Sequence, residues 1–185
     1  MNHQYISNRQ WGRSMQDDIT DAVNWAVKEG IADKDRICIY GGSYGGYATM
    51  AGLTFTPDLY QCGINYVGVT DLPLLFKSLP DSWGAAAVTL ADQVGDPKKE
   101  KEFLEQWSPS NHADKIKVPV FMAYGRRDPR VVIAHAKVMA RAMKKNGVKY
   151  ELMIKGDEGH GYRKQENRYD FYGRMETFLA ENLNP

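Results

Sequence analysis

The sequence has little that would direct it to a membrane or a nucleic acid. Its 24 basic residues are nearly balanced by 23 acidic ones, and a net charge of +1 supplies no field that attracts nucleic acid or anionic lipid. No apolar run approaches the ~20 residues needed to span a bilayer, and the first residues contain no apolar segment typical of a secretory signal. We therefore expect no nucleic-acid or membrane partner, a cytoplasmic location, and a small-molecule or peptide substrate.

Cysteine is also scarce. The two cysteines, Cys38 and Cys62, lie in apolar, strand-like runs, where isolated thiols serve packing more often than redox or metal chemistry. No group of His, Cys and carboxylate residues has the spacing of a metal-ligand set. The sequence therefore predicts neither a metal nor another cofactor.

What the chain does contain is an alternation of two hydrophobic patterns over 185 residues, the length of one domain. Short apolar runs predict strands, and apolar residues spaced by three and four predict helices. Ser14 with Asp17 reads as the capping start of the first helix, and Gly30 as its end. The strands are expected at 36–40, 62–67, 118–124 and 149–154, and the helices at 14–30, 44–55, 131–145 and 166–183. The expected fold is α/β, a single domain over 1–185 with a mainly parallel sheet of about four strands flanked by helices.

One stretch departs from this alternation. Residues 71–114 hold four of the eight prolines and no clear strand. We expect a helical insertion over the carboxyl edge of the sheet, a position that suits a lid or a wall of a substrate site.

Segment 41–46 reads GGSYGG and contains a G-x-S-x-G motif around Ser43. Small residues on both sides of the serine permit a sharp strand-to-helix turn that exposes its hydroxyl. The motif lies between an expected strand and an expected helix, as this mechanism requires. A glycine-rich turn or a phosphate-binding loop is the alternative, but no lysine follows as a phosphate loop demands. We therefore expect Ser43 to be a nucleophile.

A serine hydroxyl needs a general base at neutral pH, and four histidines compete for that role. His160 lies in a glycine-flanked loop just after the last expected strand, where an imidazole can reach the carboxyl edge of the sheet. His135 lies inside an expected helix and reads as a packing or surface residue. His112 reads as a structural residue in a turn, and His3 lies in a terminal tail. We expect His160 to be the base.

The third member of such a site is a carboxylate that holds the base in one tautomer. Asp128 follows the third expected strand, again at its carboxyl end. Asp157 and Glu158 are alternatives, although their closeness in sequence to His160 makes the geometry harder. The order Ser43, Asp128, His160 along the chain is that of α/β-hydrolases.

Catalysis at a serine also needs donors for the oxyanion. The backbone N–H of Tyr44, directly after the nucleophile, is one such donor. The second donor normally comes from a loop earlier in the chain, and here only Tyr5 is a candidate, by position alone.

At these residues the sequence resembles the catalytic domain of the prolyl oligopeptidase family of serine peptidases, especially its acylaminoacyl-peptidase and dipeptidyl-peptidase-like branch. The similar segments are Trp11-Gly12 with Asp17-Asp18, GGSYGGY at 41–47, SPSNHADKIKVPVFMAYGRRDPRV at 108–131, and GHGYRKQENRYDFYGRMETFLAENL at 159–183. The resemblance implies that the family's serine, aspartate and histidine correspond to Ser43, Asp128 and His160.

The sequence departs from that family on the upstream side. Family members carry a β-propeller, further sheet strands and a loop or tyrosine that completes the oxyanion hole. The resemblance thus implies a partial α/β-hydrolase fold of about four strands where a full sheet has about eight. The strand at 36–40 would then present an unpaired apolar edge to water, and we expect a homo-oligomer to cover it.

Three functions follow as hypotheses. The first is a serine esterase acting on small acyl esters, because ester hydrolysis asks less of an oxyanion hole than amide hydrolysis. The second is an oligopeptide peptidase of acylaminoacyl or dipeptidyl type, which the resemblance favours. The third is a non-catalytic fragment or binding scaffold. Ester against peptide turnover separates the first two hypotheses.

Overall fold

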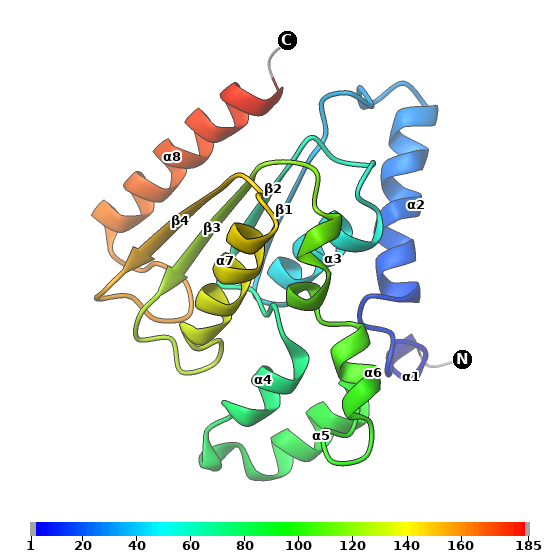
Figure 1. Ribbon diagram of the computed structural model, residues 1–185, viewed down its shortest axis with the longest axis vertical. Coiled ribbons are helices and arrows are strands. Elements are labelled where there is room, and N and C mark those ends of the chain that lie inside the picture. The colour runs from blue at the N-terminus through cyan, green and yellow to red at the C-terminus, as the bar shows by residue number, and fades with distance from the viewer. Residues whose placement is uncertain (1–2, 184–185) are drawn as a thin grey trace.

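The computed structural model describes residues 3–183 and contains a four-stranded parallel sheet (Figure 1). The strands occur in the order β1-β2-β3-β4, so neighbours in sequence are neighbours in space. Their bounds are Cys38–Gly42 (β1), Cys62–Tyr66 (β2), Val120–Gly125 (β3) and Tyr150–Lys155 (β4). The predicted α/β architecture is confirmed, with four strands at the four expected places.

The register of the sheet brings the ends of all four strands to one edge. Cys38 pairs with Cys62, Gly63 with Val120, and Val120 with Tyr150. Because the strands are parallel and in register, the residues that follow β1, β3 and β4 emerge at the same edge. This edge is where an open α/β sheet normally binds its ligands.

Helices cover both faces of the sheet (Figure 1). On one face α3 packs on β1 and β2, α7 packs on β4, and α2 lies outside α3. On the other face α8 packs on β2 and β3. The bounds are Ser14–Lys28 (α2), Tyr44–Phe55 (α3), Ala134–Lys145 (α7) and Gln165–Leu183 (α8), and a short α1 spans His3–Ile6.

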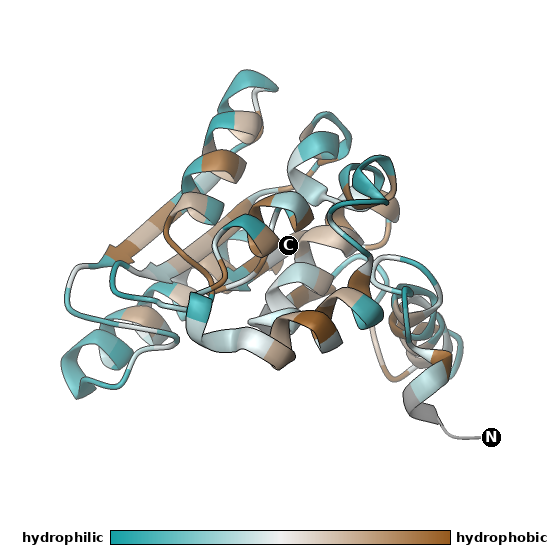
Figure 2. Ribbon diagram, turned by 90° about the horizontal axis from the view of Figure 1, so that it is seen from below, coloured by the Kyte–Doolittle hydropathy of each residue, from teal (hydrophilic) through white to brown (hydrophobic). Residues whose placement is uncertain are grey.

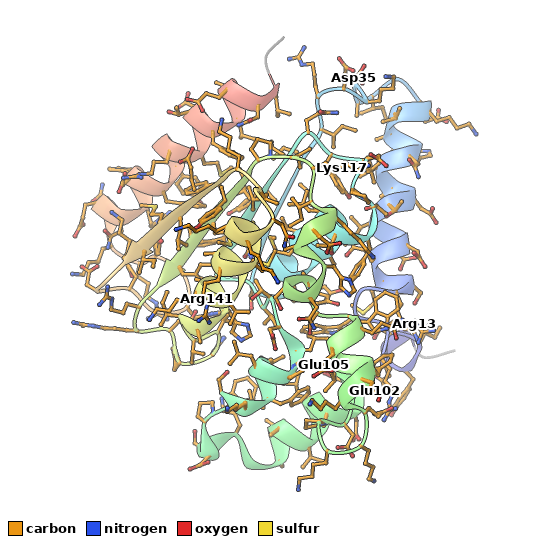
Figure 3. The ribbon with its side chains drawn as sticks, in the orientation of Figure 1. Arg13, Asp35, Glu102, Glu105, Lys117 and Arg141 are labelled. Atoms are coloured by element: carbon orange, nitrogen blue, oxygen red, sulfur yellow. The ribbon has the colours of Figure 1, made fainter. Side chains whose placement is uncertain are left out.

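The two central strands are buried on both sides, which explains their continuous apolar sequences. Phe121 and Ile64 face the cluster that α8 closes, whereas Met122 and Val120 face the larger cluster under α3 and α7. Figure 2 shows the same arrangement, with hydrophobic residues along the strands and hydrophilic residues in the loops. Many charged side chains lie at the surface, as Arg13, Glu102 and Arg141 in Figure 3 illustrate, all three of which are exposed.

The start of α2 differs from the prediction. The helix begins at Ser14, but Arg13 occupies the N-cap position and makes no capping hydrogen bond with its side chain. Ser14 already lies inside the helix and donates its hydroxyl to Gln10 Oε1, so the capping motif predicted for Ser14 and Asp17 is wrong. The end of the helix is as expected, because Gly30 takes a φ of 71° just beyond Glu29 and so terminates the helix.

Residues 71–114 fold into helices. They form α4 (Leu72–Lys77), η1 (Asp81–Trp83), α5 (Gly84–Val94), α6 (Lys101–Gln106) and η2 (Pro109–Lys115). Of these, α4, α5 and α6 lie together below the sheet in Figure 1, whereas η2 packs on α3 and α7. Two hydrogen bonds tie both ends of this segment to each other near β2, from Leu72 N–H to Ser108 Oγ (2.8 Å) and from Ser110 N–H to Thr70 O (2.9 Å). The segment is therefore anchored at the carboxyl end of β2.

The edge of the sheet at β1 is open. β1 pairs only with β2, and its residues are half-buried or exposed, with Tyr40 46% exposed. Across residues 3–183, no helix combines the length and the apolar character needed to cross a membrane.

Candidate active site

Ser43 lies on a sharp turn between β1 and α3. β1 ends at Gly42, α3 begins at Tyr44, and Ser43 between them takes φ 58° and ψ −116°. A positive φ is strained for a residue other than glycine, and such strain concentrates at functional sites. The Ser43 N–H donates to Tyr66 O (2.9 Å), and the Ser43 carbonyl accepts the Tyr47 N–H (3.1 Å). Both strand and helix thus hold the serine in this conformation.

Two of the glycines around Ser43 are required by close approach of other backbone atoms. A Cβ on Gly41 would meet the backbone of Gly45, and a Cβ on Gly46 would lie 2.5 Å from Gly68 Cα. Real Cβ atoms do not approach other atoms so closely, so larger residues would force the turn apart. Gly41 of the motif, and Gly46 just beyond it, are thus required by the packing of the turn, whereas a Cβ on Gly45 would meet nothing within 4 Å.

His160 and Asp128 complete a chain of hydrogen bonds that starts at Ser43. His160 Nε2 lies 2.9 Å from Ser43 Oγ, and His160 Nδ1 lies 2.7 Å from Asp128 Oδ2. The His160 side chain is 18% exposed and the Asp128 side chain is fully buried. The structure therefore brings together the three residues that the sequence singled out, with the imidazole between the hydroxyl and the carboxylate.

Asp128 is held by the backbone of its own loop. Its Oδ1 accepts the N–H groups of Arg130 (2.8 Å) and Val131 (3.0 Å), which leaves Oδ2 for His160. A carboxylate has no proton to donate, so His160 Nδ1 must carry the proton in this bond. His160 Nε2 is then unprotonated and can accept the proton of Ser43 Oγ.

The two alternative acids are engaged elsewhere. Glu158 accepts the N–H groups of Arg163 and Lys164, both at 2.9 Å, and a further hydrogen bond from Asn167 Nδ2 (2.8 Å). Burial alone would raise the pKa of Glu158, but these hydrogen bonds outweigh it and lower the pKa. Asp157 binds Lys164 Nζ (2.6 Å). Both carboxylates therefore fix the loop of His160 to the start of α8 and do not orient the imidazole.

Comparison with models of known protein families matches residues 2–185 to the prolyl oligopeptidase family. The chain belongs to the prolyl oligopeptidase family. It is 42% identical over 178 residues to dipeptidyl aminopeptidase BIII of Pseudoxanthomonas mexicana, and 29% identical over 175 residues to the acylamino-acid-releasing enzyme of Arabidopsis thaliana. These alignments cover 95% and 87% of this chain, but 26% and 22% of the relatives.

Solved structures of other peptidases share this fold. A puromycin-hydrolyzing peptidase of Mycobacterium tuberculosis superimposes with a TM-score of 0.91 and 29% identity, over 97% of this chain and 27% of that chain. The chain thus spans about a quarter of the length of the relatives it matches.

In this prolyl oligopeptidase-family chain, Tyr44 directly follows Ser43 and is the first residue of α3. Its N–H has no carbonyl partner within its own helix, because the first N–H groups of a helix never do. The Tyr44 ring packs against Trp11 (4.6 Å between ring centres), and burial, with a smaller contribution from Asp18, raises the pKa of the phenol to about 12. The side chain therefore stays neutral. Tyr5, the other residue considered for the oxyanion, is 71% exposed.

His112 and His135 form hydrogen bonds with other parts of the chain. His112 Nε2 lies 2.7 Å from Gln106 O, so this ring stabilises a turn as predicted. His135 is fully buried in α7, and its Nδ1 accepts the Thr70 N–H (3.3 Å). The side chain of His3 lies outside the described residues.

The buried His135 should make the fold sensitive to acid. Burial lowers the pKa of His135 to about 4, against 6.5 for an unperturbed histidine. Between these two pH values the unfolded chain binds a proton that the folded chain does not, so stability falls as the pH drops from 6.5 to 4. We expect this loss to reach up to about 3 kcal/mol, at 1.36 kcal/mol for each pH unit.

The measurement is urea unfolding between pH 4 and 8 for the wild type and for His135→Asn. Asparagine keeps an acceptor for the Thr70 N–H and cannot titrate. The variant should lose less stability than the wild type between pH 6.5 and 4. Parallel curves for the two proteins would show that His135 does not contribute.

Some residues near the site escaped sequence reasoning. Asn65 is fully buried in β2, where its Nδ2 donates to the Tyr124 hydroxyl (3.1 Å) and its Oδ1 accepts the Gly68 N–H (2.9 Å). The Tyr124 hydroxyl in turn donates to Gly68 O (2.7 Å). This network fixes the turn after β2 directly beneath Gly46. The available signal was a single asparagine in an otherwise apolar strand.

The described part of the chain offers no evident metal site. Among residues 3–183, no group of three or more His, Cys, Asp or Glu side chains is arranged to hold a metal ion.

Proposed function

We propose that the chain carries the hydrolytic centre of a serine hydrolase, with Ser43 as nucleophile, His160 as general base and Asp128 as the residue that orients the base. The observation that carries this proposal is the continuous hydrogen-bond chain from Ser43 Oγ through His160 to Asp128 Oδ2. Membership of the prolyl oligopeptidase family supports it.

In the proposed reaction, Ser43 Oγ attacks the carbonyl carbon of the substrate while His160 Nε2 takes the hydroxyl proton. Asp128 stabilises the imidazolium through its bond to Nδ1, and the Tyr44 N–H donates to the developing oxyanion. Collapse of the tetrahedral intermediate transfers the proton from His160 to the leaving group and leaves an acyl group on Ser43. A water molecule, deprotonated by His160, then releases the acid.

For the substrate we propose small acyl esters, with oligopeptides of dipeptidyl or acylaminoacyl type as the alternative. The peptide alternative is supported by the dipeptidyl aminopeptidase to which this chain is similar. The ester is supported by the chemistry of the two bonds, because an ester has a better leaving group than an amide and its hydrolysis asks less of the oxyanion site. A non-catalytic scaffold is the third reading.

Hydrolysis of a short p-nitrophenyl ester and of an acyl-aminoacyl p-nitroanilide, with wild type and Ser43→Ala side by side, tests these readings. Ester turnover that depends on Ser43, with no anilide cleavage, supports the esterase. Cleavage of the anilide that depends on Ser43 supports the peptidase. Equal rates for wild type and variant on both substrates would leave only the scaffold.

We also propose that residues 71–114 form a wall or lid of the substrate site within one domain spanning 1–185. The anchoring of this segment at the carboxyl end of β2 supports the proposal. The segment also lines an open pocket of about 960 Å³ between α4, α5 and the loop at 96–100, to which Arg9 contributes and which none of Ser43, Asp128 and His160 lines.

For the open edge at β1 we propose association between copies of this chain. The exposed Tyr40 and the unpaired backbone of β1 support this, since open strand edges pair readily. Sedimentation equilibrium should then show a mass that rises above that of one chain with concentration. A single monomeric species at high concentration would contradict the proposal.

The cytoplasm remains the proposed location. Cys38 and Cys62 are both free although they are paired in register on adjacent strands, which suits a reducing compartment. Fractionation of cells with an antibody to this chain would test it.

A further inference from the structure

Tyr66 touches both halves of the proposed active site. It is the last residue of β2, and its carbonyl accepts the Ser43 N–H (2.9 Å). Its phenol oxygen accepts the N–H of Tyr162, two residues after His160. One residue is thus bonded through its main chain to the nucleophile turn and through its side chain to the histidine loop.

We propose that Tyr66 is a positioning residue that fixes the distance between Ser43 Oγ and His160 Nε2. This inference rests on the proposed function of those two groups. Tyr66 itself does not contact the reacting atoms in this assignment, and it acts by holding the loop that carries the imidazole against the turn that carries the hydroxyl.

The loop needs such a restraint because glycines flank His160 on both sides. Gly161 takes a φ of 93°, a conformation that side chains rarely adopt, and a Cβ there would lie 3.5 Å from the Tyr66 hydroxyl. Glycine adds conformational freedom to the chain, so the position of the imidazole depends on hydrogen bonds from outside the loop. The phenol of Tyr66 supplies one of them.

The Tyr66 ring is itself held in place. It stacks on Phe171 of α8, with ring centres 4.7 Å apart and planes 20° apart. It also meets the Tyr162 ring edge to face at 5.2 Å. Phe171 is 2% exposed, so the platform under Tyr66 belongs to the core. The acceptor is therefore rigid.

The acceptor is also constant in charge. Burial raises the pKa of Tyr66, and the hydrogen bond from Tyr162 opposes this only in part. The phenol thus stays neutral over the pH range in which a serine hydrolase works.

The test is Tyr66→Phe, which keeps the ring and its stacking and removes only the acceptor. Tyr172→Phe is the matched control, because its ring packs on the same Phe171 while the residue is 51% exposed. Three measurements are made on the 185-residue chain. The first is the rate of covalent labelling of Ser43 by a fluorophosphonate, and the second is steady-state hydrolysis of the p-nitrophenyl ester, which gives kcat and KM. The third is NMR, which follows amide hydrogen exchange and the His160 Nδ1–H proton signal.

We expect Tyr66→Phe to lower the labelling rate and kcat by about 10- to 100-fold with KM unchanged, since small displacements of a catalytic group have effects of this size. The Tyr162 amide should lose its protection from exchange and the Nδ1–H signal should broaden. Tyr172→Phe should match the wild type in all three measurements. A general structural defect would instead lower the stability of the fold, and it would not lower kcat while leaving KM unchanged.

The inference and the proposed function fail in different ways. If the wild type is labelled at Ser43 and Tyr66→Phe is labelled as fast, the inference is overturned and the function stands. If the wild type is not labelled, the function falls, and an unchanged Nδ1–H signal in Tyr66→Phe overturns the inference too. If Tyr66→Phe does not fold, amide hydrogen exchange of the wild type tests the inference instead. A Tyr162 amide that exchanges as fast as an amide in an open loop would show that the hydrogen bond to Tyr66 is absent, and the inference would be overturned.

Discussion

Replacement of Ser43 by alanine should abolish covalent labelling by a fluorophosphonate and lower ester turnover by roughly 10⁴-fold or more. The Ser43 side chain is hydrogen-bonded to His160 through Oγ, whereas the hydrogen bonds that hold the turn come from the Ser43 backbone. Alanine therefore removes the nucleophile and leaves the turn in place. The measurement is labelling and steady-state turnover, with circular dichroism to verify the fold.

Ser14→Ala is the control for this experiment. Ser14 is exposed on α2 and bonds only to Gln10 among the contacts described above, so its loss should leave labelling at the wild-type rate. Labelling that persists in Ser43→Ala would place the nucleophile at another residue and would remove the basis of the proposed mechanism.

Asp128→Asn should lower kcat by about 10⁴-fold without unfolding the chain. The N–H groups of Arg130 and Val131 both point at Oδ1, so the carbonyl oxygen of the asparagine should occupy that place. The amide nitrogen then faces His160 Nδ1 and donates to it. The imidazole is forced to carry its proton on Nε2, where it can no longer accept the proton of Ser43 Oγ.

The control is Asp157→Asn, a change of the same kind in the loop that carries His160. Asp157 binds Lys164 and Asn167 at the surface, so its neutralisation should change kcat by less than threefold. If the two variants lose the same activity, the effect belongs to general loop stability, and the orienting role of Asp128 would have to be withdrawn.

The outline of this fold could be predicted because it depends on local patterns. Apolar runs of strand length predicted four strands, each within two residues of its observed start, and the sequence patterns between and around them predicted α2, α3, α7 and α8. Gly30 and Gly147 both take φ of 71° just after a helix, which is the conformation for which glycine is selected. The structure also brings Ser43, Asp128 and His160 together, and their chemical roles stay predictions.

What the sequence could not predict are contacts between residues that are remote along the chain. The hydrogen bond from the Tyr162 N–H to the Tyr66 hydroxyl joins two segments that are 96 residues apart, and no local sequence pattern indicates it. Glu158 is an alternative acid in the sequence because it lies close to His160, yet its carboxylate binds Arg163 N–H and Asn167 at the start of α8. The capping role predicted for Ser14 is wrong because a cap depends on the exact residue at which the helix begins, which local patterns do not fix.

The crossover from β2 to β3 bears on how this family can diversify. It runs from Tyr66 to Val120 and contains α4, α5 and α6, whereas the other crossovers each hold one long helix. The entropy lost on closing a loop grows only with the logarithm of its length, so doubling this connection would cost about 0.6 kcal/mol. Because both ends of the segment are anchored near β2, insertions between them need not disturb the strands. Selection can therefore remodel this part of the protein while the turn at Ser43 and the sheet beneath it stay unchanged.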